Sequence, residues 1–198
     1  LQGGHPPTHD DARTLIADVV VSHFCHQREH AAPRLHQGIE LARRLGDAGL
    51  AAAGDATLAF ELALQGEFRD AEGCVESALV IADAADDAWL RSLALLSRGI
   101  AQSMQDRHRE AERWMDQAAE QAARLGTGHF QFFYTVINRG LQRFYIGDRR
   151  GAADDWLFAL DYCARLQISR GAAGCVEGAA YLAADNGQLA LAARFLVA

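Results

Sequence analysis

Lysine is absent from this chain, and all 19 of its basic residues are arginine. A Walker-type phosphate-binding loop, a protein-kinase site and a Schiff-base site each need a lysine amine at a fixed position, so these classes are excluded within the chain. The sequence also lacks the Gly-x-Ser-x-Gly elbow of α/β-hydrolases and the His-Glu-x-x-His helix of zinc proteases. We therefore expect a chain that is not an enzyme, with no catalytic residues and no cofactor.

Positive charge and long apolar runs are also scarce. The chain has 26 acidic residues against 19 basic ones, which gives a formal net charge of -7. Direct binding of nucleic acid is disfavoured, because a phosphate backbone attracts a basic face. No apolar run approaches the roughly 18 residues of a membrane span, and no signal-peptide pattern precedes the first expected helix. We expect a soluble, cytoplasmic protein that contacts neither nucleic acid nor membrane.

Cysteine is rare, and its spacing predicts no metal site. No Cys-x-x-Cys pair occurs, and we expect reduced core thiols at the four positions Cys25, Cys74, Cys163 and Cys175. Residue types that bind metals cluster at His23, Cys25, His26 and His30. Because His26 falls at an expected turn, His23 and His30 belong to different helices, and we expect no metal site there.

What the chain does contain is a repeated unit of about 40 residues. Matching apolar patterns begin at alanines spaced 40, 40, 41 and 40 positions apart: Ala31, Ala71, Ala111, Ala152 and Ala192. In the second and third copies, apolar residues follow each alanine at offsets of 3, 4, 7, 8 and 11, as in Cys74, Val75, Ala78, Leu79 and Ala82. These offsets place the side chains on one stripe of an α-helix, which must be buried.

Turn residues and small residues recur at the same spacing as the alanines. Five positions before each alanine stand His26, Gly66, Asp106, Gly147 and Gly187, most of which tolerate a left-handed backbone. Seven positions before each turn residue stand Val19, Ala59, Gly99, Gly140 and Ala180, most of them small enough for two helices to approach closely. Gly46 and Gly126 end two of the second helices as left-handed caps. The pattern predicts an all-α chain of helix hairpins.

This pattern resembles the tetratricopeptide repeat, a helix hairpin that stacks into a superhelix. The resemblance implies a right-handed α-α superhelix of about five units, although the period is longer than usual and the first-helix aromatic is replaced by Leu62, Gln102, Arg143 and Ala183. The long period and alanine-rich helices are similar to the repeat regions of bacterial LuxR-type, maltose-regulator-like and SARP transcriptional regulators. The segment 170–180, together with Asn186-Gly187 and 192–196, is the part most similar to the ends of those regions.

The repeat also sets the expected domain boundaries. Residues 1–8 are expected to form a linker, because Gly3-Gly4-His5-Pro6-Pro7 cannot enter a helix. Residues 9–198 form one solenoid domain with units at about 9–46, 47–86, 87–127, 128–167 and 168–198, the last truncated. We expect a fragment of a longer chain. The stripe of the last unit lacks a capping element, which is compatible with homodimerisation.

The resemblance implies that the exposed side of each first helix lines the inner wall of the superhelix. That wall is apolar and aromatic: Phe24, Phe60, Leu64, Leu93, Leu96, Ile100, Met104, Tyr134, Ile137, Asn138, Leu141, Phe144, Tyr145, Glu177 and Tyr181. An aromatic concave surface suits a helix, a peptide or a small organic ligand, because it buries a large area with few polar losses. The alternative is that a tight superhelix buries this wall against itself.

Three arginines form a second candidate site. Arg98 and Arg139 occupy the same position in consecutive units, and Arg143 lies one helical turn beyond Arg139. Stacked guanidinium groups can clamp a carboxylate or a phosphate. The alternative is that they pair with acidic residues on neighbouring helices, such as Glu61, Asp55 or Asp154.

The sequence thus leads to two functional hypotheses. The first is a non-catalytic sensor or docking domain of a bacterial transcriptional regulator, which binds a protein, a peptide or a small-molecule inducer in the aromatic groove. The alternative is a free-standing adaptor that assembles protein complexes and has no role in transcription. The sequence that flanks this segment in its gene would discriminate between them.

Overall fold

The computed structural model describes residues 6–24 and 31–197, and for residues 18–24, 31, 169 and 170 it describes the backbone alone. Over these ranges the chain forms α-helices and no strand, so the predicted all-α class is confirmed. The helices are α1 (His9–Phe24), α2 (Ala31–Arg44), α3 (Ala48–Gln65), α4 (Phe68–Ala85), α5 (Ala88–Ser103), α6 (His108–Ala123), α7 (Phe130–Ile146), α8 (Arg149–Leu166), α9 (Ser169–Asp185) and α10 (Leu189–Leu196).

Left-handed residues separate the helices at regular intervals. Positive φ angles occur at Gly46, Gly66, Asp86, Asp106, Gly126, Gly147, Gln167 and Gly187, one every 20 or 21 positions. The turn residues predicted at 66, 106, 147 and 187 and the helix stops predicted at 46 and 126 are all confirmed. His26, the turn predicted in the first unit, lies outside the described residues.

Aspartates start several of the helices. Asp47, Asp87 and Asp148 each accept a hydrogen bond at 2.9 Å from the backbone N–H three residues later, which satisfies a helix N-terminus that would otherwise be unpaired. Helices α4, α6, α9 and α10 begin without a side-chain cap. These four helices must therefore draw their stability from packing.

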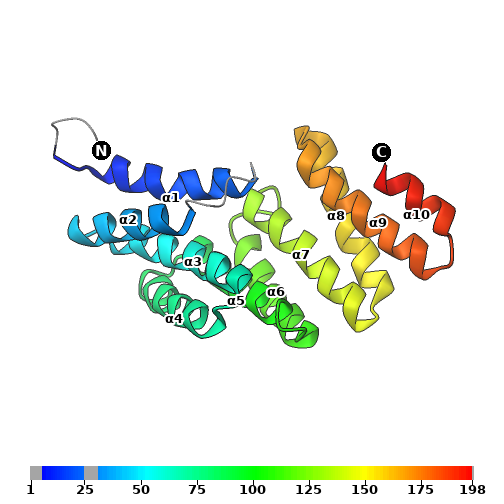
Figure 1. Ribbon diagram of the computed structural model, residues 1–198, viewed down its shortest axis with the longest axis horizontal. Coiled ribbons are helices and arrows are strands. Elements are labelled where there is room, and N and C mark those ends of the chain that lie inside the picture. The colour runs from blue at the N-terminus through cyan, green and yellow to red at the C-terminus, as the bar shows by residue number, and fades with distance from the viewer. Residues whose placement is uncertain (1–5, 25–30, 198) are drawn as a thin grey trace.

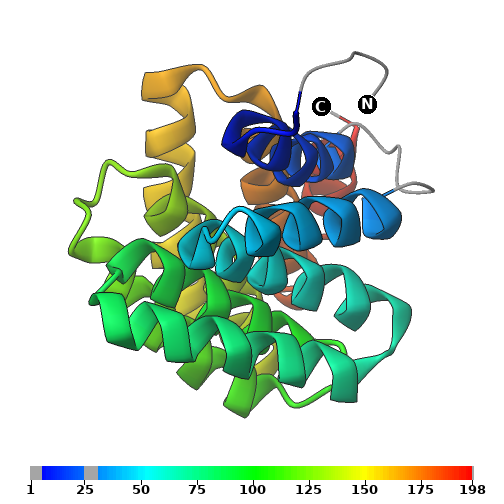
Figure 2. The same cartoon turned by 90° about the vertical axis from the view of Figure 1, so that its left-hand side faces the viewer.

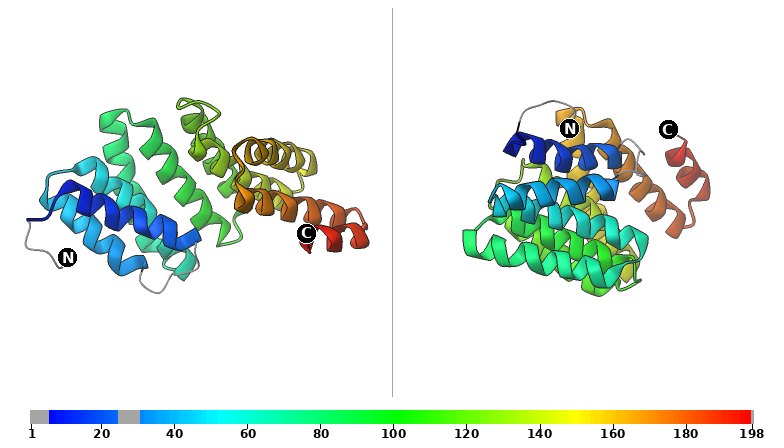
Figure 3. Two further views of the ribbon diagram at one scale, coloured as in Figure 1. Left: turned by 90° about the horizontal axis from the view of Figure 1, so that it is seen from above. Right: turned by 60° about the vertical axis from the view of Figure 1, so that its left-hand side comes forward.

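The helices pack as a row of hairpins. Each helix packs on the next one along the chain, and each odd-numbered helix also packs on the next odd-numbered helix. Within the described ranges no two even-numbered helices pack together. The row runs from α1 at one end to α10 at the other (Figure 1), and the view from above shows the same order (Figure 3). Seen from the α1 end, helices of later units lie behind those of earlier ones (Figure 2). This arrangement is repeat-like.

In the three central hairpins a small residue of the first helix packs against a larger residue 16 positions later. A Cβ added to Gly99 would lie 2.8 Å from Cγ of Met115, and one added to Gly140 would lie 2.8 Å from Nε1 of Trp156. Ala59 shares a core cluster with Val75 in the same way. The small residues predicted at positions 59, 99 and 140 therefore do allow the two helices of a hairpin to approach.

The core runs along the row. The predicted stripe is fully buried at Ala71, Val75, Ala78, Ala82, Ala111, Met115, Ala118 and Ala122, whereas Cys74 and Trp114 are only half-buried at its edge. In the last hairpin, Leu196 stands at the position of Val75, Met115 and Trp156 but is 63% exposed. Whether a second copy of the chain covers this face stays a prediction.

Candidate functional site

An apolar pocket opens between α7 and α9. Its volume is about 430 Å³, and it is lined by Phe130, Phe133, Tyr134, Ile137, Ile168, Gly171 and Gly174. The four α7 residues fall at offsets of 0, 3, 4 and 7, so they form one stripe of that helix. The α9 side contributes two glycines, which present no side chain toward that stripe. We call it the α7–α9 pocket. It exists because large side chains on α7 lie opposite two glycines on α9 that have no side chain.

The two glycines of α9 differ in what surrounds them. A Cβ added to Gly171 would lie 2.6 Å from Cζ of Phe133 and 2.7 Å from Sγ of Cys163, so close packing requires glycine there. A Cβ added to Gly174 would meet no atom within 4 Å. Glycine inside a helix costs about 1 kcal/mol relative to alanine, and packing at position 174 does not demand it. Gly174 therefore leaves a space that a bound group can enter.

Ring contacts hold the aromatic side of the pocket in place. The rings of Phe130 and Tyr134 stack with centroids 6.0 Å apart, and Phe133 stacks on Tyr162 at 4.7 Å. The Tyr162 hydroxyl donates a hydrogen bond to the carbonyl oxygen of Gly128 at 2.8 Å, which fixes that ring. Phe130 is 43% exposed at the mouth of the pocket. Among the side chains that the structure describes, none that lines the pocket is charged, so these residues favour a neutral apolar group.

The predicted inner wall is closed around α5. Ile100 and Leu96 are 5% and 2% exposed and belong to a core cluster that also contains Phe60 and Tyr134. Ile100 is buried because α5 packs on both α3 and α7, which favours the alternative of a closed wall at this position. Partner binding at Ile100 stays a prediction. Leu64, Leu93 and Leu141 are half-buried, Met104 is 51% exposed, and Phe24 lies outside the described side chains.

The predicted wall is more open toward the end of the row, on α7 and α9. The rings of Tyr145 and Tyr181 lie 5.9 and 5.7 Å from that of Phe144, and Tyr145 is 55% exposed. The Tyr181 hydroxyl donates to Glu177, and this bond raises the pKa of Tyr181 to about 12. Asn138 donates to the Tyr134 carbonyl oxygen at 2.8 Å, so its amide is engaged by its own helix.

Of the predicted wall residues, only Tyr134 and Ile137 line the α7–α9 pocket. The other five residues of the pocket were not predicted to lie on the wall: Phe130, Phe133, Ile168, Gly171 and Gly174. The signal that could have identified them is the pair Gly171 and Gly174 in the middle of a helix, opposite the aromatic run 130–134.

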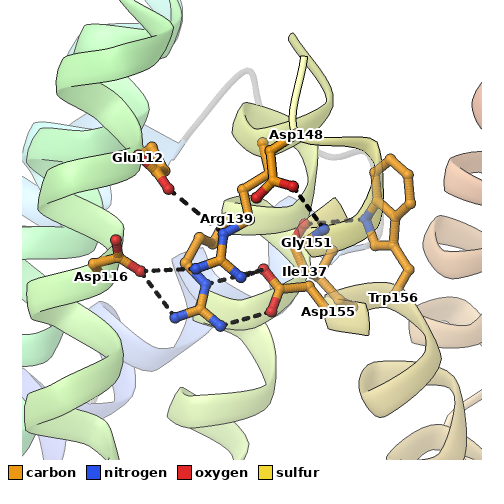
Figure 4. A network of polar contacts seen from close by, with 9 residues as sticks. Glu112, Asp116, Ile137, Arg139, Asp148, Gly151, Asp155 and Trp156 are labelled. Carbon is orange, nitrogen blue, oxygen red and sulfur yellow. Dashed lines mark hydrogen bonds and ion pairs between the residues drawn. The ribbon is translucent and has the colours of Figure 1, made fainter. Parts of the chain in front are cut away.

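The three predicted arginines are held by carboxylates. Arg139 donates to Asp155 at 2.6 and 2.9 Å and to Asp116 at 3.0 Å (Figure 4). Arg143 donates to Asp155 at 3.1 Å and lies 3.5 Å from the Glu112 carboxylate. Burial acts to lower the pKa of Arg139, but the hydrogen bonds and charges of Asp155 and Asp116 outweigh it, and the pKa is raised.

Arg98 repeats this arrangement one unit earlier. It pairs with Glu72 at 2.6 Å and with Glu76, and its guanidinium carbon lies 4.8 Å from the centre of the Trp114 ring. Among the carboxylates that the sequence suggested, Asp55 instead binds Arg43 at 2.9 Å. These contacts favour the ion-pair interpretation of the arginines, and anion binding by them stays a prediction.

A polar depression of about 290 Å³ lies between α2, α3 and α4 and is lined by Arg43, Asp55, Arg69, Asp70, Gly73, Cys74 and Ser77. Asp55 is 5% exposed and accepts hydrogen bonds from Arg43 and, at 3.2 Å, from the Ser77 hydroxyl. The buried carboxylate is thus satisfied from within the chain. A Cβ on Gly73 would meet no atom within 4 Å.

Neither a metal centre nor a membrane segment is found in the described part of the chain. Its His, Cys, Asp and Glu side chains form no group of three or more placed to hold a metal ion. The side chains of His23, Cys25, His26 and His30 lie outside that part. Among the helices described, none combines the length and apolarity needed to cross a bilayer. In comparisons with known proteins, neither a protein-family model nor a curated protein matches this chain.

Proposed function

We propose that this chain is a non-catalytic helical-repeat domain that binds an apolar group of a partner in the α7–α9 pocket. One observation carries the proposal: an aromatic stripe on α7 faces Gly174, a helix-interior glycine that no neighbour fills. The partner is a protein, a peptide or a small molecule that presents a neutral apolar group.

The size and chemistry of the pocket support this proposal. A volume of about 430 Å³ falls within the range of known small-ligand sites, and such sites are mostly apolar. Full burial of a leucine or phenylalanine side chain contributes about 1.5–3 kcal/mol. Stacking on the Phe130 and Tyr134 rings adds about 0.5–1.5 kcal/mol for an aromatic group. One buried group therefore gives weak binding, and a tight complex needs further contacts.

We further propose that the hairpins form a right-handed superhelix of the tetratricopeptide type. The left-handed residue every 20 or 21 positions and the packing of each odd-numbered helix on the next support it. By this proposal the domain is the sensor or docking segment of a bacterial transcriptional regulator. Binding in the pocket shifts the relative populations of superhelix conformations that differ in curvature. The alternative is a free-standing adaptor. An ATPase and a helix-turn-helix encoded beside this segment would favour the regulator.

Pocket binding can be tested with the neutral fluorescent probe N-phenyl-1-naphthylamine. The wild-type chain should bind it with saturable enhancement of fluorescence. The variant Gly174→Leu should lose at least about fivefold in affinity, because about 1 kcal/mol of burial is lost when the leucine occupies the space. The variant Gly73→Leu adds the same side chain at a helix glycine that also has open space, and it should bind as the wild type does. Undiminished binding by Gly174→Leu, or none by the wild type, would contradict the proposal.

A further inference from the structure

Small residues are buried at matching positions of every junction between one unit and the next. The second helix of a unit and the first helix of the following unit contribute the pairs Ala42 and Gly54, Ala82 and Ala94, Ala122 and Thr135, and Cys163 and Cys175. All eight residues are buried, and the members of each pair are 12 or 13 positions apart. Ala82 and Ala94 belong to one core cluster, which indicates close approach of α4 and α5 at this position. The fourth junction, between α8 and α9, places two thiols at this point.

The two thiols contact each other. The thiol of Cys175 donates a hydrogen bond to the sulfur of Cys163. Neither cysteine forms a disulfide, and both belong to a core cluster that also contains Phe133 and Tyr162. A disulfide requires two Cβ atoms about 4 Å apart, and two helices that admit alanine pairs at the same position can reach this separation. Backbone approach and sulfur contact thus both suit a covalent bond.

The α7–α9 pocket lies next to this pair, because Phe133 and Ile168 line the pocket and also pack in the cluster of the two thiols. Gly171 lines the pocket, and a Cβ added to it would lie 2.7 Å from Sγ of Cys163. The sulfur therefore lies directly behind the glycine wall, with no side chain of Gly171 between them. Because Cys163 is 1% exposed, a small neutral molecule in the pocket reaches its sulfur only when the packing around Gly171 opens.

We propose that Cys163 and Cys175 form an intramolecular disulfide that joins α8 to α9 when a peroxide oxidises the two thiols. The Cys163 thiolate attacks a peroxide oxygen, the O–O bond breaks, and hydroxide leaves, which forms a sulfenic acid. The Cys175 sulfur attacks the sulfenic sulfur, the S–S bond forms, and water leaves. In sum, two thiols lose two electrons and two protons, and hydrogen peroxide is reduced to two water molecules.

The environment of the pair sets the rate and order of these steps. Burial raises the pKa of both thiols, that of Cys175 to about 12, so the reactive thiolate is rare near neutral pH. Cys163 accepts the hydrogen bond, which favours its thiolate over that of Cys175. Oxidation is therefore slow at neutral pH and accelerates as the pH rises. Because α9 forms one wall of the pocket, the disulfide fixes that wall to α8.

The test uses the folded chain with Cys25→Ser and Cys74→Ser, which leaves only the pair. After native incubation with hydrogen peroxide, the protein is denatured, alkylated and analysed by mass spectrometry. We expect loss of two hydrogen atoms, no alkylated cysteine, a peptide that links positions 163 and 175, and a melting temperature that rises by several degrees. Dithiothreitol should reverse all four changes.

Two matched variants separate this bond from other oxidation. Cys163→Ala and Cys175→Ala in the same background restore the alanine of earlier junctions and should fold, but neither should give the monomeric two-hydrogen loss. Three results would overturn the proposal: both thiols still alkylated after prolonged peroxide, sulfinic acid without a cross-link, or disulfide-linked dimers in place of the intramolecular bond.

Discussion

Two glycines on α9, only four positions apart, should respond to alanine with opposite signs. A Cβ on Gly178 would lie 2.6 Å from Cε3 of Trp156 and closer still to Cδ2. The indole cannot retreat, because Gly140 lies against its other side and its Nε1 donates to the Ile137 carbonyl oxygen at 3.3 Å. At Gly174 the added methyl group would meet nothing within 4 Å. The same substitution therefore meets a rigid ring at one position and open space at the other.

The magnitudes follow from these surroundings. Alanine improves helix propensity by about 1 kcal/mol at either site. Overpacking against a fixed ring costs about 1–3 kcal/mol, and contacts of 2.3–2.6 Å belong in the upper part of that range. Gly178→Ala should therefore destabilise the fold by about 1–2 kcal/mol. Gly174→Ala meets no such cost and should stabilise the fold by about 1 kcal/mol. For a chain of this size, 1 kcal/mol moves the melting temperature by about 2–4 °C.

The assay is urea unfolding followed by circular dichroism, with comparison of midpoints at constant slope. We expect the free energy of unfolding to rank Gly174→Ala, wild type and Gly178→Ala from highest to lowest. A Gly178→Ala variant as stable as Gly174→Ala would refute the packing of Trp156 between α7 and α9.

Three further predictions concern the ion pairs, the turns and the caps. Asp155→Ala should lower the free energy of unfolding in urea by about 2–3 kcal/mol, because it removes a carboxylate shared by two largely buried arginines; an unchanged midpoint would contradict the network. Gln167→Gly should raise the melting temperature by a few degrees, because a side chain at φ 55° carries left-handed strain; a lower value would show that the strain is absent. The Leu50 N–H holds the pKa of Asp47 below its ordinary value, so this residue stabilises the fold above about pH 4 and loses its effect as the pH falls further. Asp47→Asn should therefore make the acid side of a plot of urea midpoint against pH shallower, and an unchanged plot would count against the cap.

The sequence was sufficient for the helices and their turns, because each depends on local chemistry. Glycine or aspartate at a fixed spacing specifies a left-handed turn, and an alanine stripe specifies the buried helix face. These signals repeat, so the turn at Gly147 could be inferred from the one at Gly66. The small residues at Gly99 and Gly140 could likewise be matched to a partner helix.

The candidate site could not be predicted to the same extent, because it depends on how helices of different units fit together. The positions of Ile100 and Tyr134 in the repeat are equally compatible with an open wall, yet Ile100 is buried where α3, α5 and α7 converge. Gly171 and Gly174 look alike in sequence, and only the distances to Phe133 and Cys163 distinguish a packed glycine from an open one. The arginine pairs were anticipated as an alternative, but their carboxylate partners were not.

The most direct test of the central claim is nuclear magnetic resonance of the chain with its isoleucine methyl groups labelled with ¹³C, titrated with N-phenyl-1-naphthylamine. Ile137 and Ile168 line the α7–α9 pocket, whereas Ile39 and Ile100 lie in other core clusters. The account predicts that the resonances of Ile137 and Ile168 shift together and saturate at one dissociation constant while those of Ile39 and Ile100 stay in place. Unmoved Ile137 and Ile168 signals, or shifts of equal size at all four residues, would contradict it.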